Sequence, residues 1–259
     1  MWTHAHVVTL IPSLAVYLVI AIVLGVWLKN ASEKVRMIPI HIITFLMVVL
    51  ELIKQIRSFK GGEYEFENMP LYYCSLFIFF YLFVSLYRGK DKNRIRVLTV
   101  VSGITVFVVM MVLPNIIYSD NAIKNCMNDF DYFHTVVYHN LVFLGTMLMI
   151  SLRLFKIEFK KDLICTSSVY LLYCLIAGPM AIYLGENYNQ FHHNALPQIE
   201  DIRMRFISNM GPNFGQAFYM FCDTMITVGF SVLMFLVIAG VIKLGQKCLK
   251  IRVEKKSKN

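Results

Sequence analysis

The sequence has few charged residues, and this shortage excludes an ordinary soluble domain. Of its 259 residues, 16% are charged and 58% are hydrophobic, whereas a soluble domain carries about 25% charge because its surface must be solvated. The net charge of +9 lies in short clusters between apolar runs, so no basic face for nucleic acid is predicted. The composition is typical of a polytopic membrane protein that folds as one helical bundle.

The cysteines and histidines lack the spacing of a metal or disulfide framework. The six cysteines form no CxxC pair and no repeated interval, which argues against a zinc ribbon or a disulfide scaffold. His134 and His139 are five residues apart rather than four, and the adjacent His192 and His193 side chains diverge. A retinal-type cofactor needs a lysine deep in a helix, but the last apolar run has only Lys243 at its end. We therefore expect neither a metal nor a cofactor.

Seven apolar runs are long enough to cross a membrane. Each is close to the ~20 residues that cross about 30 Å of hydrocarbon as a helix. The runs cover residues 7–28, 37–56, 70–87, 96–114, 133–153, 163–184 and 218–242. The N-terminal MWTHAH lacks the basic region of a cleavable signal peptide, so the first run is interpreted as an uncleaved anchor. The sequence predicts an all-α transmembrane domain of seven helices at 1–242 and a basic tail at 243–259.

Basic residues are concentrated in alternate loops, and this pattern predicts the orientation. The clusters lie at residues 29–36, 88–96, 153–161 and 243–259. Since Lys and Arg are retained on the cytoplasmic side, the N-terminus is predicted outside and the C-terminus in the cytoplasm. The tail is expected to contact anionic lipid headgroups, although a solvated end is the simpler interpretation. Abundant Ile, Lys, Asn, Phe and Tyr are typical of an AT-rich bacterial genome, so the bacterial plasma membrane is the predicted location.

With this orientation, polar side chains gather at the outer ends of the helices. Six of the seven histidines, all but His41, lie on that side. Cys74, Asp223 and His139 lie about 6, 8 and 9 Å below the outer ends of their helices at 1.5 Å per residue. A charged group near the centre of a span costs about 2.5–3.5 kcal/mol on insertion scales, and such groups usually face a wet cavity. The sequence predicts an outward-facing polar pocket, lined or supported by Glu51, Lys54, Cys74, His134, His139 and Asp223.

Each of these residues also has a structural interpretation. Glu51 and Lys54 are three residues apart on one helical face and could neutralise each other. Cys74 could be a small packed side chain, and His139 could be a buried hydrogen-bonding group. In the same way, Asp223 could pair with a neighbouring helix and His134 could lie at the membrane interface. The residues alone leave these alternatives open.

Four segments, in order along the chain, resemble a known family. They are ELIKQI (51–56), MPLYYC (69–74), YHNLVFLG (138–145) and GENYNQF (185–191). Through them the chain resembles the YwaF-like integral membrane proteins, which include a vertebrate transmembrane acyltransferase of ether-phospholipid remodelling. The resemblance implies a catalytic Cys74 and a catalytic His139. It also implies supporting roles for Glu51, Lys54 and Asn187.

One element departs from the family pattern. The family carries Pro-Leu-His-x-Cys at the start of the third helix, and the corresponding stretch here is PLYYC, residues 70–74. Tyr73 is interpreted as the replacement of the histidine. If that histidine is the catalytic base in the family, this chain is inactive or uses another group. If His139 is the base, Tyr73 changes only the pocket.

The predicted function is a phospholipid acyltransferase, or a related lipid hydrolase, embedded in the membrane. Cys74 would be the nucleophile and His139 the base, and the partners would be membrane phospholipids or lysophospholipids. Two other functions remain open. The outer pocket could be the vestibule of a transporter or channel, or the protein could be a non-enzymatic membrane scaffold or sensor.

Overall fold

The fold is almost entirely helical. The structure is a computed structural model that describes residues 2–60, 62–194 and 196–256, with the backbone alone at 60, 116, 117 and 246–256. Within these residues one antiparallel pair of two-residue strands occurs, β1 (Phe59–Lys60) with β2 (Glu63–Tyr64). The predicted all-α class is confirmed.

Six helices are long and apolar enough to cross a membrane. They are α1 (His4–Trp27), α3 (Ile38–Arg57) together with the short α2 (Glu33–Arg36), α5 (Lys92–Val112), α8 (Phe130–Ser151), α9 (Phe159–Leu184) and α11 (Pro212–Lys256). Each contains most of one predicted apolar run. Helices satisfy all their interior backbone hydrogen bonds within the segment, which is why apolar runs of this length fold in this way in lipid. The chain is a multi-pass membrane protein.

The third predicted span is shorter than expected. Residues 70–72 are not helical, and the 3-10 turn η2 (Tyr73–Ser75) leads into α4 (Leu76–Leu86). At 1.5 Å per residue, the 11 residues of α4 extend about 16 Å, well short of the hydrocarbon thickness. The prediction of seven full-length spans is therefore not confirmed. The structure has six such helices in its described part and a shorter seventh.

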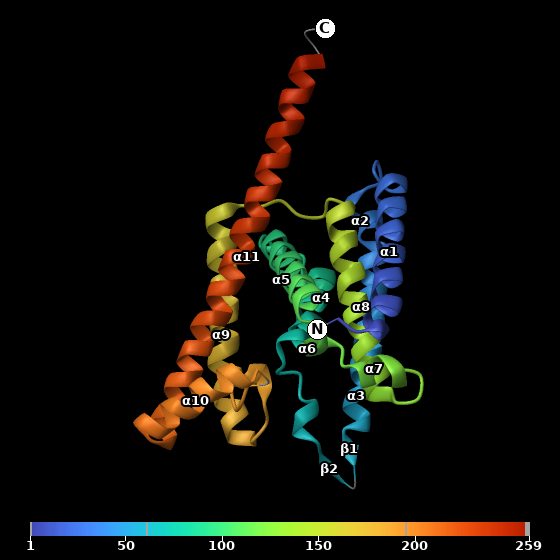
Figure 1. Ribbon diagram of the computed structural model, residues 1–259. Coiled ribbons are helices and arrows are strands. Elements are labelled where there is room, and N and C mark those ends of the chain that lie inside the picture. Colours follow the sequence, from blue (N-terminus) through green and yellow to red (C-terminus); the bar gives the residue numbers. More distant parts are fainter. Residues whose placement is uncertain (1, 61, 195, 257–259) are drawn as a thin grey trace.

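The remaining short elements lie at one end of the bundle, where Figure 1 also shows β1 and β2. This end is called the loop end below. Its elements are η1 (Phe66–Asn68), α6 (Pro114–Ile117), α7 (Asp120–Asn125), η3 (Tyr188–Gln190) and α10 (Pro197–Met210). The opposite end, called the basic end, carries the connections rich in Lys and Arg that precede α3, α5 and α9.

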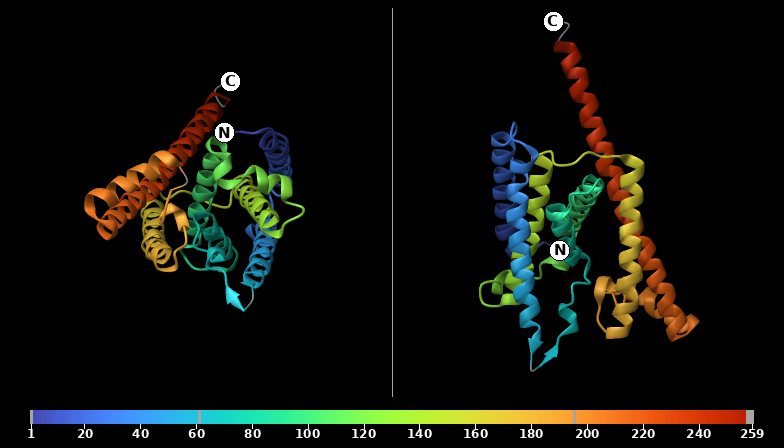
Figure 2. Two further views of the ribbon diagram at one scale, coloured as in Figure 1. Left: turned by 60° about the horizontal axis from the view of Figure 1, so that its bottom comes forward. Right: turned by 180° about the vertical axis from the view of Figure 1, so that it is seen from behind.

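Helix α5 is the centre of the bundle. It packs against α4, α8, α9 and α11, and Figures 1 and 2 show it between the α9–α11 pair and the group of α1, α3 and α8. Eleven α5 residues are buried, against three in α1. Gly103 lets α5 approach α8 closely, because a Cβ there would lie 2.0 Å from Oγ1 of Thr146. Small residues allow such approaches between membrane helices.

The basic tail continues α11 without a break. The helix runs through residue 242 as far as Lys256 and projects beyond the other helices (Figure 1). The side chains of residues 246–256 in this tail, including that of Cys248, lie outside the described residues, as do residues 257–259. The boundary at 243 and the contact with anionic lipid stay predictions.

Candidate functional site

A cavity of about 590 Å³ lies toward the loop end of the bundle. Small-molecule sites usually enclose about 300–1,000 Å³. Its lining comes from the ends of α3, α5 and α8, from the middle of α11, and from η1, η2 and η3. Five of the predicted site residues line it: Lys54, Tyr73, Cys74, His134 and His139.

Cys74 lies in the 3-10 turn η2, just before α4. Its sulfur is a free thiol. The Tyr138 hydroxyl donates a hydrogen bond to the backbone carbonyl of Cys74 at 3.4 Å, which ties the turn to α8. Because the turn precedes the helix, the cysteine lies at the wall of the cavity and not in the packed centre of α4.

His139 is buried on α8, and its ring is held in one orientation. Its Nδ1 lies 2.7 Å from the carbonyl oxygen of Thr135. Since a carbonyl can only accept, Nδ1 carries the proton. The rings of Tyr118 and Tyr138 pack edge-on against the imidazole, with centroids 5.6 and 5.9 Å away. Within the described residues Nε2 of His139 has no hydrogen-bond partner, and none joins His139 to Cys74.

Glu51 supports His134 and does not itself line the cavity. Its Oε2 lies 3.3 Å from Nε2 of His134, an ion-pair distance, although the alignment is not that of a hydrogen bond. Gln55 donates to Oε1 of Glu51 at 2.7 Å and to the carbonyl of Asn68 at 2.9 Å. Among the described residues Glu51 forms no ion pair with Lys54. The carboxylate therefore joins α3 to α8, and Gln55, which donates to it, joins α3 to η1.

Tyr73 connects the cavity to the interior of the bundle. Its hydroxyl donates to that of Tyr170 at 2.7 Å, and the two rings stack with centroids 5.2 Å apart and planes within 4°. Tyr170 in turn donates to Ser102 of α5.

The Pro-Leu-His-x-Cys pattern of the YwaF-like resemblance places its histidine at a residue other than Tyr73. Aligned on Pro70 and Cys74, Pro-Leu-His-x-Cys puts the histidine at Tyr72, so the assignment of its replacement to Tyr73 is wrong by one position. The ring of Tyr72 also lines the cavity and packs edge-on against Tyr188 at 5.3 Å.

Asn187 and Asp223 lie outside the cavity and position a loop that borders it. Oδ1 of Asn187 accepts hydrogen bonds from the backbone N–H groups of His192 and His193. Asn189 does line the cavity, and its amide donates to Oδ2 of Asp223 at 3.4 Å and to Oγ1 of Thr227 at 3.3 Å. Both residues thus act on the site through η3.

Tyr188, the residue after Asn187, anchors this loop to η1. It is fully buried, and its hydroxyl donates to the backbone carbonyl of Phe66. Burial raises the pKa of Tyr188, so the phenol remains protonated and keeps its role as a donor. This contact joins η3 to η1, and both elements contribute residues to the cavity wall.

Sequence reasoning missed several lining residues. Asp131, Thr135 and Tyr138 join His134 on the cavity wall. Their spacing of three or four residues, which places side chains on one helical face, was the available signal. Asn189, Gln190 and Ser231 come from other elements, and no local pattern connects those elements to α8.

Comparison with known proteins gives a family. A model described as the TMEM164 family matches residues 1–236. The match includes every residue that lines the cavity. No curated protein and no solved structure matches the chain.

Proposed function

The chain belongs to the TMEM164 family, and from this premise we propose that it is a membrane-embedded acyltransferase that acts on phospholipids. Cys74 is the nucleophile and His139 the general base in this proposal. One observation carries it: Cys74 and His139 line the same cavity, and Nε2 of His139 has no hydrogen-bond partner among the described residues.

The histidine tautomer suits it to act as a base. A neutral imidazole carries one proton, and the carbonyl of Thr135 holds that proton on Nδ1 of His139. Nε2 therefore has a free lone pair, on a side chain that lines the cavity. An orienting hydrogen bond of this kind on the far nitrogen is the usual way to fix the reactive nitrogen of a catalytic histidine.

The proposed reaction has two half-reactions. Nε2 of His139 takes the proton of the Cys74 thiol, and the thiolate attacks the carbonyl carbon of an acyl ester in a phospholipid. The ester C–O bond breaks, the leaving oxygen takes the proton from His139, and an acyl thioester remains on Cys74. An acceptor hydroxyl of a lysophospholipid then gives its proton to His139 and attacks the thioester. The thiolate leaves and recovers the proton.

The cavity lining matches an amphipathic substrate. Polar groups from α3, η1 and α8 lie on its walls, including Lys54, Asn68 and Asp131, and apolar side chains from α5 and α11 complete it, including Val109 and Phe230. A phospholipid has both parts, a charged headgroup and apolar chains. The lining thus supports a lipid ester better than a fully polar substrate.

Cys74 and His139 must move closer together before the proposed reaction. No hydrogen bond joins Cys74 to His139 in the described chain, whereas proton transfer requires an approach to about 3 Å. Catalytic contacts are often long without substrate and shorten when it binds. The 3-10 turn that carries Cys74 precedes the rigid helix α4 and is the segment expected to move.

The test is acyl transfer in reconstituted liposomes that contain a phospholipid donor and a labelled lysophospholipid acceptor. Cys74→Ser and His139→Ala should each reduce transfer at least 100-fold, and mass spectrometry should detect a hydroxylamine-sensitive acyl group on Cys74 of the wild type. Cys222→Ser is the matched control, because Cys222 is also a partly buried free cysteine but does not line the cavity. Acyl transfer by Cys74→Ser at the wild-type rate would contradict the proposal.

A second candidate function, transport, is favoured by a row of buried polar groups. Asp162, Thr166 and Tyr170 lie four residues apart on α9 and are all buried. They extend toward the basic end from Tyr170, which stacks on the cavity residue Tyr73. Oδ1 of Asp162 and Oγ1 of Thr166 have no hydrogen-bond partner among the described residues. Proton flux into liposomes that falls in Asp162→Asn, without acyl transfer by the wild type, would favour this function.

A further inference from the structure

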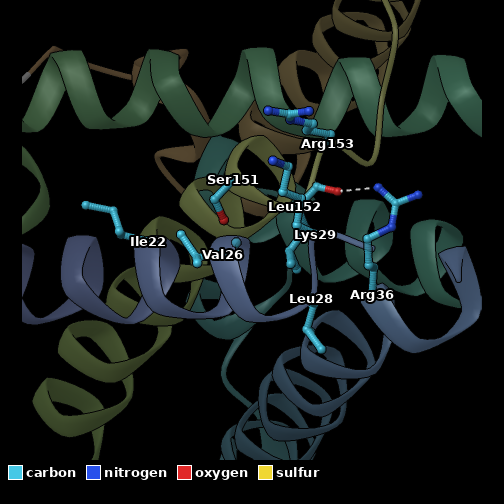
Figure 3. A pocket seen from close by; sticks show the side chains of 9 residues that line it. Ile22, Val26, Leu28, Lys29, Arg36, Ser151, Leu152 and Arg153 are labelled. Carbon is cyan, nitrogen blue, oxygen red and sulfur yellow. Dashed lines mark hydrogen bonds between the residues drawn. The ribbon is translucent and has the colours of Figure 1, made fainter. Parts of the chain in front are cut away.

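A second cavity, of about 340 Å³, lies at the basic end of the bundle. It lies where the C-terminal end of α1, the short helix α2 and the residues after α8 meet (Figure 3). Three of its lining residues are basic: Lys29, Arg36 and Arg153. Figure 3 shows Arg36 on the other side of Leu152 from Lys29 and Arg153.

None of the three basic side chains has a carboxylate partner in the described part of the chain. Other basic residues at this end do. Lys92 and Arg96 both lie 2.9 Å from the carboxylate of Glu33, and Arg94 lies 2.9 Å from that of Asp91. The cavity therefore holds three positive side chains without a carboxylate among the described residues. At neighbouring positions, the basic side chains are paired with carboxylates.

Arg36 is held in place but is not fully satisfied. Its Nη1 donates to the carbonyl oxygen of Leu152 at 2.7 Å, the dashed line in Figure 3. Its Nε is buried and has no hydrogen-bond partner among the described residues. A guanidinium fixed in this way keeps donors available for an anion, and Arg presents them in a fork that suits phosphate.

Arg153 occupies a backbone position that glycine usually fills. It follows the C-terminal end of α8 with φ of 53°, in the left-handed region, where helices commonly place glycine. An arginine at this position is conformationally unfavourable, which is consistent with a use for its charge.

Close packing brings Arg153 to Lys29. A Cβ on Gly25 of α1 would lie only 3.1 Å from Cβ of Ser151 in α8. Since Gly25 has no side chain, the end of α1 meets the end of α8, and the residues that follow each helix share one cavity.

We propose that this cavity binds the phosphate of an anionic phospholipid in the adjacent leaflet. The ligand chemistry is a phosphate anion that receives the donors of Lys29, Arg36 and Arg153. Ile22 and Val26 supply the argument for a lipid source, because these apolar side chains line the cavity and are exposed on the outer surface of α1. Basic pockets between membrane helices are known to bind anionic headgroups. This site is at the opposite end of the bundle from Cys74 and does not depend on the proposed reaction.

The experiment measures lipid retention and thermal unfolding of the full chain in detergent, with phosphatidylglycerol, phosphatidylcholine or inorganic phosphate added. The wild type should retain phosphatidylglycerol in native mass spectrometry and unfold at a higher temperature with it, but not with phosphatidylcholine. Removing one basic residue should weaken binding about fivefold. If inorganic phosphate alone gives the same stabilisation and displaces the lipid, the phosphate site stands but its ligand is soluble.

Two variants leave the Arg36–Leu152 contact intact. Arg153→Gly removes the charge and suits the left-handed backbone, so it should fold without lipid as the wild type does. The double variant Lys29→Gln, Arg153→Gln should weaken binding further. Lys34→Gln is the matched control, because Lys34 is exposed on α2 and does not line the cavity. Retention of phosphatidylglycerol by both variants at the wild-type level would overturn the proposal.

Discussion

The Nδ1–H of His139 donates a hydrogen bond to the backbone carbonyl of Thr135, one helical turn earlier, at 2.7 Å. This contact fixes the imidazole ring against the backbone of α8 and leaves Nε2 as the only proton acceptor of the ring. A buried polar group without a partner is costly to retain, by about 1–3 kcal/mol. An unpartnered Nε2 on a residue that lines the cavity is therefore a feature to explain, and the proposed proton transfer would explain it.

The first prediction separates the structural bond of His139 from its role as a base. In His139→Asn, the amide can donate to the Thr135 carbonyl in place of Nδ1, so the fold should survive. No base remains, so acyl transfer should fall about 10²–10⁴-fold. Initial rates in liposomes and thermal unfolding of the same preparation test both parts. His193→Asn changes a histidine outside the cavity and is the control; wild-type rates in His139→Asn would remove His139 from the mechanism.

The second prediction concerns Tyr72, at the position where the Pro-Leu-His-x-Cys pattern of the resemblance has its histidine. If that histidine were the required base, Tyr72→His would increase acyl transfer. Because Nε2 of His139 is already free to accept a proton, we expect no increase. A modest loss of stability should follow from the loss of the edge-on contact with Tyr188. A clear gain in rate would show that His139 is not the sole base.

The third prediction concerns Tyr73. Tyr73→Phe keeps the ring stacked on Tyr170 and removes only the hydroxyl that donates to it. We expect a stability loss of about 1 kcal/mol and an unchanged rate, because the hydroxyl is used within the bundle. Tyr73→Leu loses the stack as well and should be less stable. Thermal unfolding and initial rates measure the two effects, and a rate lost in Tyr73→Phe with the fold intact would give the hydroxyl a catalytic role.

Length and hydrophobicity were enough to predict the long helices, because lipid leaves a spanning segment few alternatives to a helix. The same reasoning failed for residues 70–87. There the apolar run continues through Leu71 and Tyr72, but the backbone becomes helical only from Tyr73. Run length measures how much chain can be in lipid and does not locate the first helical turn.

The depth of side chains predicted that polar groups would gather at one end, but it could not assign their partners. His6 belongs to the same predicted outer group as His139, yet it is fully buried and its Nε2 lies 2.7 Å from the carbonyl of Tyr118. Glu51 pairs with His134 of another helix rather than with Lys54. Contacts between helices depend on how each helix is rotated about its axis and on how closely the helices pack. The periodicity of one helix gives no information about either.

The fourth prediction tests Asp223 as a positioning residue. Asp223→Ala removes an acceptor from the amide of Asn189, which lines the cavity. Loss of about 1 kcal/mol of hydrogen bonding should raise KM about fivefold and leave kcat nearly unchanged. Asp223→Asn keeps an acceptor oxygen and should recover most of the affinity. A fall in kcat with KM unchanged in Asp223→Ala would place Asp223 in the chemistry instead.

The fifth prediction concerns the pH dependence of α10 docking. Arg203 donates to both carboxylate oxygens of Glu200 and, through Nη1, to Gln216 of α11 at 2.7 Å. The Arg203 guanidinium holds the pKa of Glu200 below its usual range. The folded pKa is lower than the unfolded one, so this stabilisation is full above the usual glutamate pKa of about 4.3. It is lost as pH falls through the lowered folded value.

Thermal unfolding of the wild type and of Glu200→Gln should therefore differ at neutral pH and converge on acidification. The surface exposure of the pair keeps the difference small. Asp201→Asn removes an exposed carboxylate from the same helix and controls for the change in net charge. A difference between the wild type and Glu200→Gln that persists unchanged into the acid range would contradict the electrostatic origin of the α10 contact.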